Sequence, residues 1–173
     1  YKIYKKKNRV HKPIKELNNH YSFEEKTHSS YLEKEIHETS NTVKSILSKY
    51  IKDNKIDFSS HSLYSKINCI NKINIFGCGS SYNVGLIGKY LFEKLGKIPT
   101  EVKLASEYIY SPLLNNENSL NIFISQSGET ADLLSCVPLI DQYKLGILNV
   151  KYSSLSFKMD DNLYLECGKE VSV

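Results

Sequence analysis

Residues 120–140 constrain the fold of this chain more than any other stretch. Residues 120–124 form a short apolar run with β-branched side chains, which is typical of a buried central strand of a parallel sheet. From Ala131 onward, apolar side chains recur at helical spacing. Gly128 allows a tight turn between the two. The other turn residues that carry donor or acceptor side chains are Ser125, Gln126, Ser127 and Thr130.

Strands and helices alternate throughout the second half of the chain. The apolar runs predict strands at residues 72–76, 100–104, 120–124, 145–150 and 163–165. Helical patterns lie between them, at residues 82–95, 105–110 and from 131 on, where Pro138 predicts a kink or an early end. This order favours the α/β class: a doubly wound, parallel five-stranded sheet with helices on both faces.

The first 66 residues have a different pattern. Residues 1–20 alternate crudely and suggest the remnant of a β-hairpin, and residues 21–30 suggest a polar linker. Ser30 and Glu33 have capping-box spacing, which predicts a helix to about residue 38. Residues 39–41 would interrupt it before a second helix over residues 43–51. We therefore divide the chain into residues 1–20, residues 21–66 with linker and helices, and an α/β module over residues 67–173.

Composition excludes several classes of protein. No apolar run approaches the roughly 20 residues that span a membrane, and the first residues predict no signal peptide. The net charge of +4 arises from residues 1–20, which hold seven Lys or Arg and one Glu, so the remainder is slightly acidic. A nucleic-acid surface on the fold is therefore not expected, although a basic arm is an alternative use of residues 1–20. Four dispersed cysteines suggest reduced thiols and a cytoplasmic protein.

Two turns of the predicted sheet suit an anion. Free amide groups at the start of a helix attract anions, and the hydroxyls of residues 125–130 add neutral donors. The turn at Gly79, Ser80 and Ser81 also follows a strand, so both turns should open at the same edge of the sheet. Together they favour a phosphorylated ligand. The structural alternative is that Ser127 only caps a helix and Ser125 only ends a strand.

Other catalytic and cofactor motifs are incomplete. Gly77 and Gly79 begin a dinucleotide fingerprint, but its third glycine position is Tyr82, and no nucleotide phosphate loop is present. Cys78 could be an activated thiol, although a small packed residue is the favoured interpretation. The five histidines have no metal-ligand spacing, so neither a metal nor a cofactor is expected. We find no acid, base or lysine between the two turns that is placed to do chemistry on a sugar, which predicts binding without catalysis.

Three motifs carry a resemblance to a known family. The runs Cys78–Asn83, Ala105–Glu107 and Ser125–Asp132 resemble the first sugar-isomerase (SIS) module of the glutamine–fructose-6-phosphate aminotransferases, or glucosamine-6-phosphate synthases. Residues 31–38 resemble the linker helix of that family, and residues 1–20 resemble, more weakly, the last strands of its glutaminase domain. The run Gly168–Val173 resembles the segment that closes the sugar site.

The resemblance implies a function and a set of site residues. A whole protein of this family makes glucosamine 6-phosphate from fructose 6-phosphate and glutamine, for UDP-N-acetylglucosamine biosynthesis, and dimerises through its isomerase region. Its catalytic residues match no position here, so the chain alone is expected to bind the sugar phosphate and to catalyse nothing. The residues that match its substrate-binding positions are Ser80, Ser81, Ser125, Gln126, Ser127, Thr130, Cys78 and Val173.

Some features depart from the family or leave alternatives open. Ser80 replaces the usual threonine but keeps its hydroxyl, and the segment 143–150 is shorter than usual. A non-enzymatic SIS sensor of sugar phosphates is one alternative, although residues 1–28 do not predict a DNA-binding helix pair. A sugar-phosphate isomerase with a single SIS module is another, and the linker helices argue against it.

Overall fold

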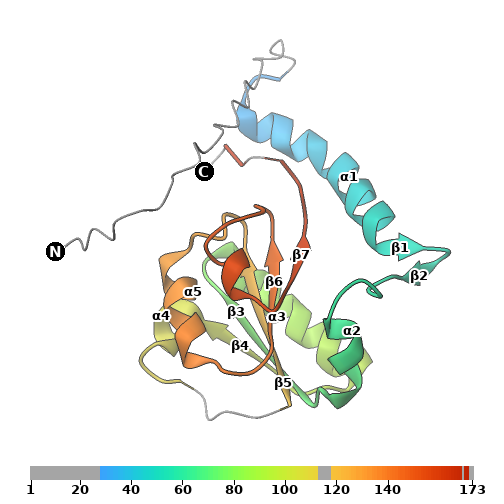
Figure 1. Cartoon of the computed structure of the whole chain (residues 1–173). Helices are drawn as coiled ribbons and strands as arrows, with labels where there is room; N and C mark the ends of the chain where they lie inside the picture. The colour runs from blue at the N-terminus through green and yellow to red at the C-terminus, as the bar shows by residue number, and fades with distance from the viewer. Residues whose placement is uncertain (1–27, 113–117, 169, 172–173) are drawn as a thin grey trace, which may run out of the picture.

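The computed structural model describes residues 28–112, 118–168 and 170–171, and the hairpin expected within residues 1–20 lies outside them (Figure 1). A five-stranded sheet forms its centre, with the strand order β4-β3-β5-β6-β7 and every neighbouring pair parallel. The predicted α/β fold class is therefore confirmed. The strands are β3 (Lys72–Gly77), β4 (Thr100–Leu104), β5 (Ser119–Ser125), β6 (Lys144–Leu148) and β7 (Asp161–Tyr164).

The helices that follow these strands cover both faces of the sheet, as Figure 1 shows. After β3 comes α3 (Ser80–Leu91), which continues as a π-helical turn, η2 (Phe92–Gly96). After β4 comes α4 (Ala105–Tyr108), and after β5 comes α5 (Ala131–Cys136). Pro138 lies in the 3-10 turn η3 (Val137–Leu139) that follows α5, so the early end of this helix is as expected.

Side-chain alternation along β3 and β5 builds one core on each face. Phe76 and Phe123 stack on one face with ring centroids 4.9 Å apart, and they pack against α4 and α5. Ile75 belongs to the core on the opposite face, where α3 crosses the sheet. At Gly85 of α3 an added Cβ would lie 3.1 Å from Ile75 Cγ2, so only a glycine lets the helix come this close.

A polar pair lies inside the core between these strands. Asn74 Nδ2 donates to Asn121 Oδ1 over 2.9 Å, and both side chains are buried. At the edge strand β4, Glu101 accepts from Lys72 and Lys103 over 2.8 Å each. These two cations hold the pKa of Glu101 low, at about 2.

Helix α1 (Tyr31–Tyr50) is continuous, so the predicted interruption at residues 39–41 is wrong. The hydroxyl of Thr39 donates to the carbonyl of Glu35 over 3.2 Å, which lets a threonine remain in a helix interior. Ser30 caps the helix by accepting from the amide of Glu33 at 3.1 Å, as predicted. The carboxylate of Glu33 bonds instead to Ser29.

Helix α1 lies beside the carboxyl ends of the strands (Figure 1) and has no buried residue. Its last turn is tied to the end of β7, because the hydroxyl of Tyr50 donates to the carbonyl of Tyr164 over 3.0 Å. Four short elements lead from α1 to the sheet: β1 (Ile51–Lys52), β2 (Lys55–Ile56), α2 (Leu63–Lys66) and η1 (Ile67–Cys69). The 3-10 turn η4 (Ser156–Lys158) precedes β7.

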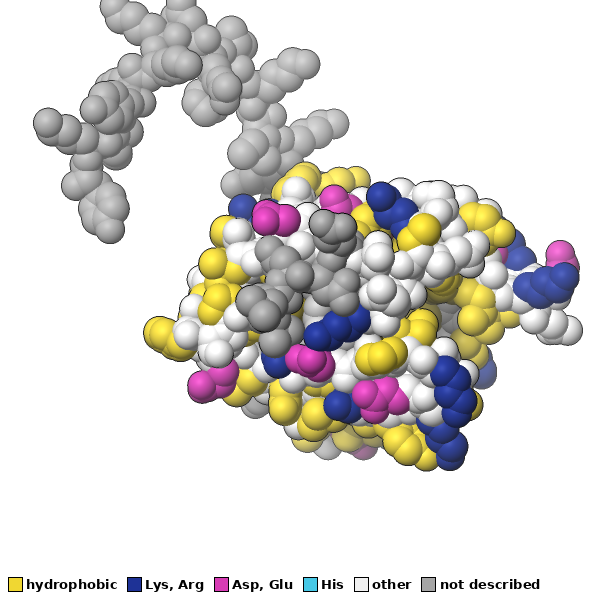
Figure 2. Space-filling view, turned by 90° about the horizontal axis from the view of Figure 1, so that it is seen from below, with side chains coloured by type: hydrophobic (Ala, Val, Ile, Leu, Met, Phe, Trp, Pro, Cys, Tyr) yellow, Lys and Arg dark blue, Asp and Glu magenta, His cyan; other side chains and the backbone are white. Residues whose placement is uncertain are grey.

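The surface opposite α1 carries charges of both signs. Figure 2, which views the molecule from below, shows Lys or Arg side chains beside Asp or Glu side chains, with hydrophobic side chains between them. Within the described residues, no helix has the length and apolar character that crossing a membrane would require.

Candidate functional site

The two serine-bearing turns lie next to each other. Strands β3 and β5 are parallel neighbours with Phe76 in register with Phe123, so both strands end at the same edge of the sheet. Cys78, just after β3, has its sulfur 4.0 Å from a carboxylate oxygen of Asp132 in α5. The expectation that the turns share one edge is therefore met.

Internal hydrogen bonds shape the turn after β5. The amide of Gly128 donates to Ser125 Oγ over 3.0 Å, and Ser125 Oγ lies 3.0 Å from Thr130 Oγ1. The amide of Glu129 donates to Ser127 Oγ over 3.2 Å. Ser125 is buried, whereas Ser127 and Thr130 are half-buried at the surface. Among the described residues, none accepts a hydrogen bond from the amides of Ser127 and Thr130.

A loop that follows β6 supports this turn from behind. The amide of Leu155 donates to the carbonyl of Gly128 over 2.9 Å, and the amide of Ser154 donates to a Glu129 carboxylate oxygen over 2.7 Å. These Ser154 bonds lower the pKa of Glu129. Its place in the first turn after β5 would suit compensation of a helix dipole, but the carboxylate of Glu129 instead ties the turn to the loop.

Gly128 is the point of closest approach between turn and loop. Its φ is +67°, and a Cβ added there would lie 2.0 Å from Ser153 Oγ, inside van der Waals contact. Ser153 is itself buried. Both the backbone conformation and the space therefore require glycine at this position.

The turn after β3 leads directly into α3. Gly79 has a φ of +53°, and the helix begins at Ser80, two residues before the predicted start. Ser80 is exposed and Ser81 is half-buried. The amide of Ser81 donates to the carbonyl of Cys78 over 3.1 Å. Since α3 has twelve residues and α5 only six, the larger helix dipole at this edge belongs to α3.

Cys78 has the environment of a packed thiol. Burial raises its pKa, and the neighbouring carboxylate of Asp132 raises it further. A thiol of raised pKa is a poor nucleophile. This agrees with the favoured interpretation that Cys78 packs beneath the turn.

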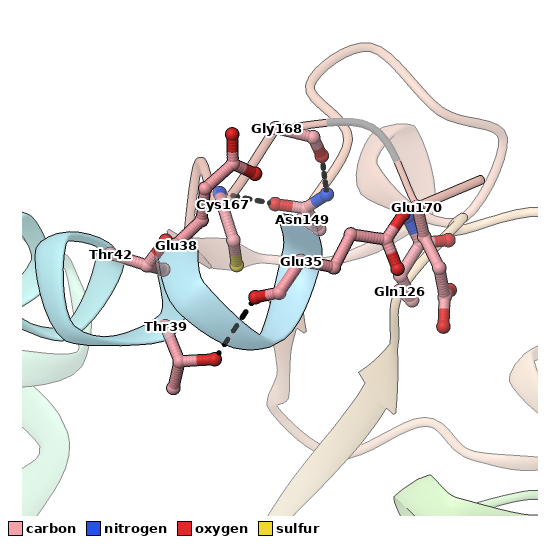
Figure 3. A pocket seen from close by; sticks show the side chains of 9 residues that line it. All are labelled: Glu35, Glu38, Thr39, Thr42, Gln126, Asn149, Cys167, Gly168 and Glu170. Atoms are coloured by element: carbon pink, nitrogen blue, oxygen red, sulfur yellow. Dashed lines mark hydrogen bonds between the residues drawn. The ribbon is translucent and has the colours of Figure 1, made fainter. Parts of the chain in front are cut away.

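A cavity of about 240 Å³ opens between α1 and the end of the sheet (Figure 3). Of the residues predicted for the site, only Gln126 lines it, whereas Val173 lies outside the described residues. The closing segment expected at residues 168–173 contributes Gly168 and Glu170. The other lining residues are Glu35, Glu38, Thr39, Thr42, Asn149 and Cys167.

Asn149 organises this cavity, and the sequence patterns did not predict it as a site residue. Its backbone amide donates to the carbonyl of Gln126 over 3.3 Å, and its side-chain Nδ2 donates to the carbonyl of Gly168 over 2.6 Å. Its Oδ1 accepts from the amide of Cys167 over 2.7 Å. The available signal was an asparagine near the carboxyl end of an apolar strand pattern, where ligand-side residues gather.

Comparison with known families identifies the module. The SIS domain model matches residues 66–172, which is more than half of the chain. The chain belongs to the SIS domain family. The SIS match covers both serine-bearing turns, the loop that supports the turn after β5 and the segment beside the cavity.

Two relatives and one solved structure are similar to more of this chain than the SIS domain model matches. The chain is 41% identical over 155 residues to the glutamine–fructose-6-phosphate aminotransferase (isomerizing) of Geobacillus kaustophilus, covering 87% of this chain and 26% of the relative. It is 39% identical over 152 residues to the enzyme of the same name from Escherichia coli K12, covering 83% and 24%. The C-terminal domain of glucosamine-fructose-6-phosphate aminotransferase from Francisella tularensis superposes with a TM-score of 0.79 at 33% identity, covering 86% of this chain and 42% of that one.

The predicted resemblance to this aminotransferase family is thus confirmed. The similarity covers more of the chain than the SIS match does, so it includes part of the region before residue 66. The chain spans about a quarter of the length of the curated relatives that it matches.

Proposed function

We propose that this chain is the sugar-phosphate-binding part of a glutamine–fructose-6-phosphate aminotransferase. The whole protein would convert fructose 6-phosphate and glutamine to glucosamine 6-phosphate and glutamate, for amino-sugar synthesis. The observation that carries the proposal is the pair of adjacent serine turns at the carboxyl edge of an SIS sheet. The extension of the similarity beyond the SIS module favours this enzyme over a stand-alone isomerase or a sensor.

The phosphate would be held by neutral donors. Neither Cys78–Asn83 nor Ser125–Asp132 contains a Lys or Arg. The amides of Ser127 and Thr130 have no acceptor among the described residues, and α3 directs its positive end to the same edge. A backbone amide that has no acceptor within the protein can donate to a bound anion.

A chain of hydrogen bonds supports Thr130 as an outward donor. The amide of Gly128 donates to Ser125 Oγ, and the Ser125 hydroxyl can then donate to Thr130 Oγ1. The proton of Thr130 is left to point to the ligand. Bonds in such a chain polarise one another, so Ser125 would strengthen binding through Thr130.

The remaining site residues follow from their places at the same edge. We propose that Ser80 and Ser81 contact the phosphate from the start of α3, and that Gln126 contacts the sugar from the cavity beside α1. Cys78 would line the floor between the two turns. Val173 is proposed on the resemblance alone. No residue of this chain is assigned a catalytic role, so we expect the chain by itself to be inactive.

The test is binding of fructose 6-phosphate to the intact enzyme, measured by calorimetric titration. Ser127→Ala removes a hydroxyl that would bond a charged phosphate, and such a bond contributes about 1.5–3 kcal/mol. We therefore expect the dissociation constant to rise about 10- to 150-fold. Ser135→Ala is the matched control, because Ser135 is exposed on α5 and its hydroxyl donates to the carbonyl of Ala131 over 2.9 Å. Equal affinity for the wild type and Ser127→Ala would overturn the assignment.

The proposal extends to the domain division and the location of the chain. We propose the division into residues 1–20 (end of a glutaminase domain), 21–66 (linker and helices) and 67–173 (SIS module). We propose a cytoplasmic location, which agrees with the cysteines Cys69, Cys78, Cys136 and Cys167 all being free thiols.

A homodimer is proposed through the isomerase region. Helix α3 and the turn after it expose Ile87, Tyr90 and Leu95, which are 64%, 58% and 74% accessible. An apolar helix face of this kind is typical of an interface. Sedimentation of the intact enzyme would measure the state of association, and a monomer at micromolar concentration would contradict the proposal.

A further inference from the structure

Three side chains of metal-ligand type meet at the start of α1. The spacing of the histidines in the sequence predicted no metal site. In the structure His28, Glu33 and His37 come together, and one potential ligand atom of each lies within 4.8 Å of the others. His28 and Glu33 are half-buried and His37 is exposed, so an ion can reach them from solvent.

The backbone arrangement explains why they converge. Glu33 and His37 are four residues apart in a helix, which places them on one face. His28 precedes the N-cap residue Ser30, and the chain turns there so that its ring stacks on His37, with centroids 5.3 Å apart and an angle of 19° between the planes. The imidazoles of His28 and His37 are therefore close to the carboxylate of Glu33.

The carboxylate of Glu33 is already oriented. Its Oε2 accepts from the amide of Ser29 over 2.7 Å and from the Ser29 hydroxyl over 2.6 Å. Among the described residues, none donates a hydrogen bond to Oε1 of Glu33. Metal-binding carboxylates commonly have this kind of outer hydrogen bonding.

We propose that His28, Glu33 and His37 bind a divalent first-row transition ion, with water completing the coordination. Two nitrogens and one carboxylate oxygen are a ligand set that Zn²⁺ takes. Ligands about 2.0–2.1 Å from a tetrahedral ion lie about 3.4 Å apart. The atoms would therefore have to close by no more than about 1.4 Å, which rotation of half-exposed side chains allows.

The site would act as a clamp and is independent of the proposed sugar-phosphate function. It would fix His28, which lies before the helix, against the second turn of α1. The positive end of the helix dipole opposes a cation here. We therefore expect affinity in the micromolar range rather than the tighter binding of buried structural zinc.

The experiment is calorimetric titration of the full 173-residue chain with ZnCl₂, followed by the absorption spectrum with Co²⁺. We expect one site that weakens about tenfold or more in each of His28→Gln, Glu33→Gln and His37→Gln. Glu38→Gln is the matched control, because Glu38 lies on the same helix and pairs with Lys34 at 3.6 Å. Its affinity should equal that of the wild type.

The Co²⁺ spectrum separates this site from the free cysteines, which also bind these ions. Nitrogen and oxygen ligands give no thiolate charge-transfer band. Absence of saturation at millimolar Zn²⁺, unchanged affinity in the His28→Gln/His37→Gln double variant, or a thiolate band that accounts for all the bound Co²⁺ would each overturn the proposal. The two rings would then be a stacked pair only. Because all three side chains are at the surface, circular dichroism should show every variant folded.

Discussion

Replacing Gly128 with alanine tests how strictly the turn after β5 is defined. The added methyl group meets two obstacles. At a φ of +67° an L-residue is strained by about 1–2 kcal/mol. The methyl would also lie 2.0 Å from Ser153 Oγ and 2.5 Å from Ser153 Cβ, and overpacking of this kind typically destabilises by about 1–3 kcal/mol. Together these terms predict a loss of about 2–5 kcal/mol in the free energy of unfolding.

A double-mutant cycle with Ser153→Gly separates the two terms. The second substitution removes both atoms that the new methyl would meet, so Gly128→Ala should lose only the strain of about 1–2 kcal/mol in that background. Urea unfolding followed by circular dichroism measures all four proteins. A loss below 1 kcal/mol for Gly128→Ala, or an equal loss in both backgrounds, would refute the claim that the contact with Ser153 requires glycine at position 128.

Three other outcomes are expected. Because the pKa of Glu101 is lowered to about 2, its ion pairs stabilise the fold above pH 4.5, and this stabilisation is lost as the pH falls toward 2. Glu101→Gln should remove this part of the pH dependence of the free energy of unfolding. The loss should be at most about 1 kcal/mol, because the side chain is partly exposed. Burial raises the pKa of Cys136 to about 11, so a thiol reagent at pH 8 should modify the exposed Cys69 and leave Cys136 intact in the folded protein, as peptide mass analysis would show. Asn74→Ala leaves Asn121 Oδ1 buried without its donor, and thermal unfolding should report a loss of about 1–3 kcal/mol.

The sheet was predictable from the sequence because the central strands β3, β5 and β6 contain apolar runs that lie between turn residues. The parallel order and the shared edge of the two serine turns follow from strand–helix alternation, and the register of Phe76 with Phe123 agrees. Helix α1 was predicted as two pieces because hydroxyl residues favour caps in isolation. In the folded chain Thr39 bonds back to Glu35, a choice that local preference alone does not reveal.

Contacts between distant segments could not be predicted. Glu129 lies where a helix dipole explains it, yet its carboxylate bonds to Ser154, which follows a different strand. Asn149 joins the turn at Gln126 to the chain near Gly168, and only the three-dimensional arrangement shows this. The meeting of His28 with His37 depends in the same way on how the chain enters α1. In each case one partner lies outside the local pattern.

The dependence of the turn at Gly128 on Leu155 and Ser154 has a consequence for biosynthesis. A ribosome delivers the turn well before it delivers the loop, so β5 and the first helical residues after it exist for a time without their support. In a nascent chain halted before residue 154, the turn after β5 should be loosely formed and unable to bind a phosphate. The turn would be able to bind the ligand only after β6 and the loop that follows β6 have emerged from the ribosome.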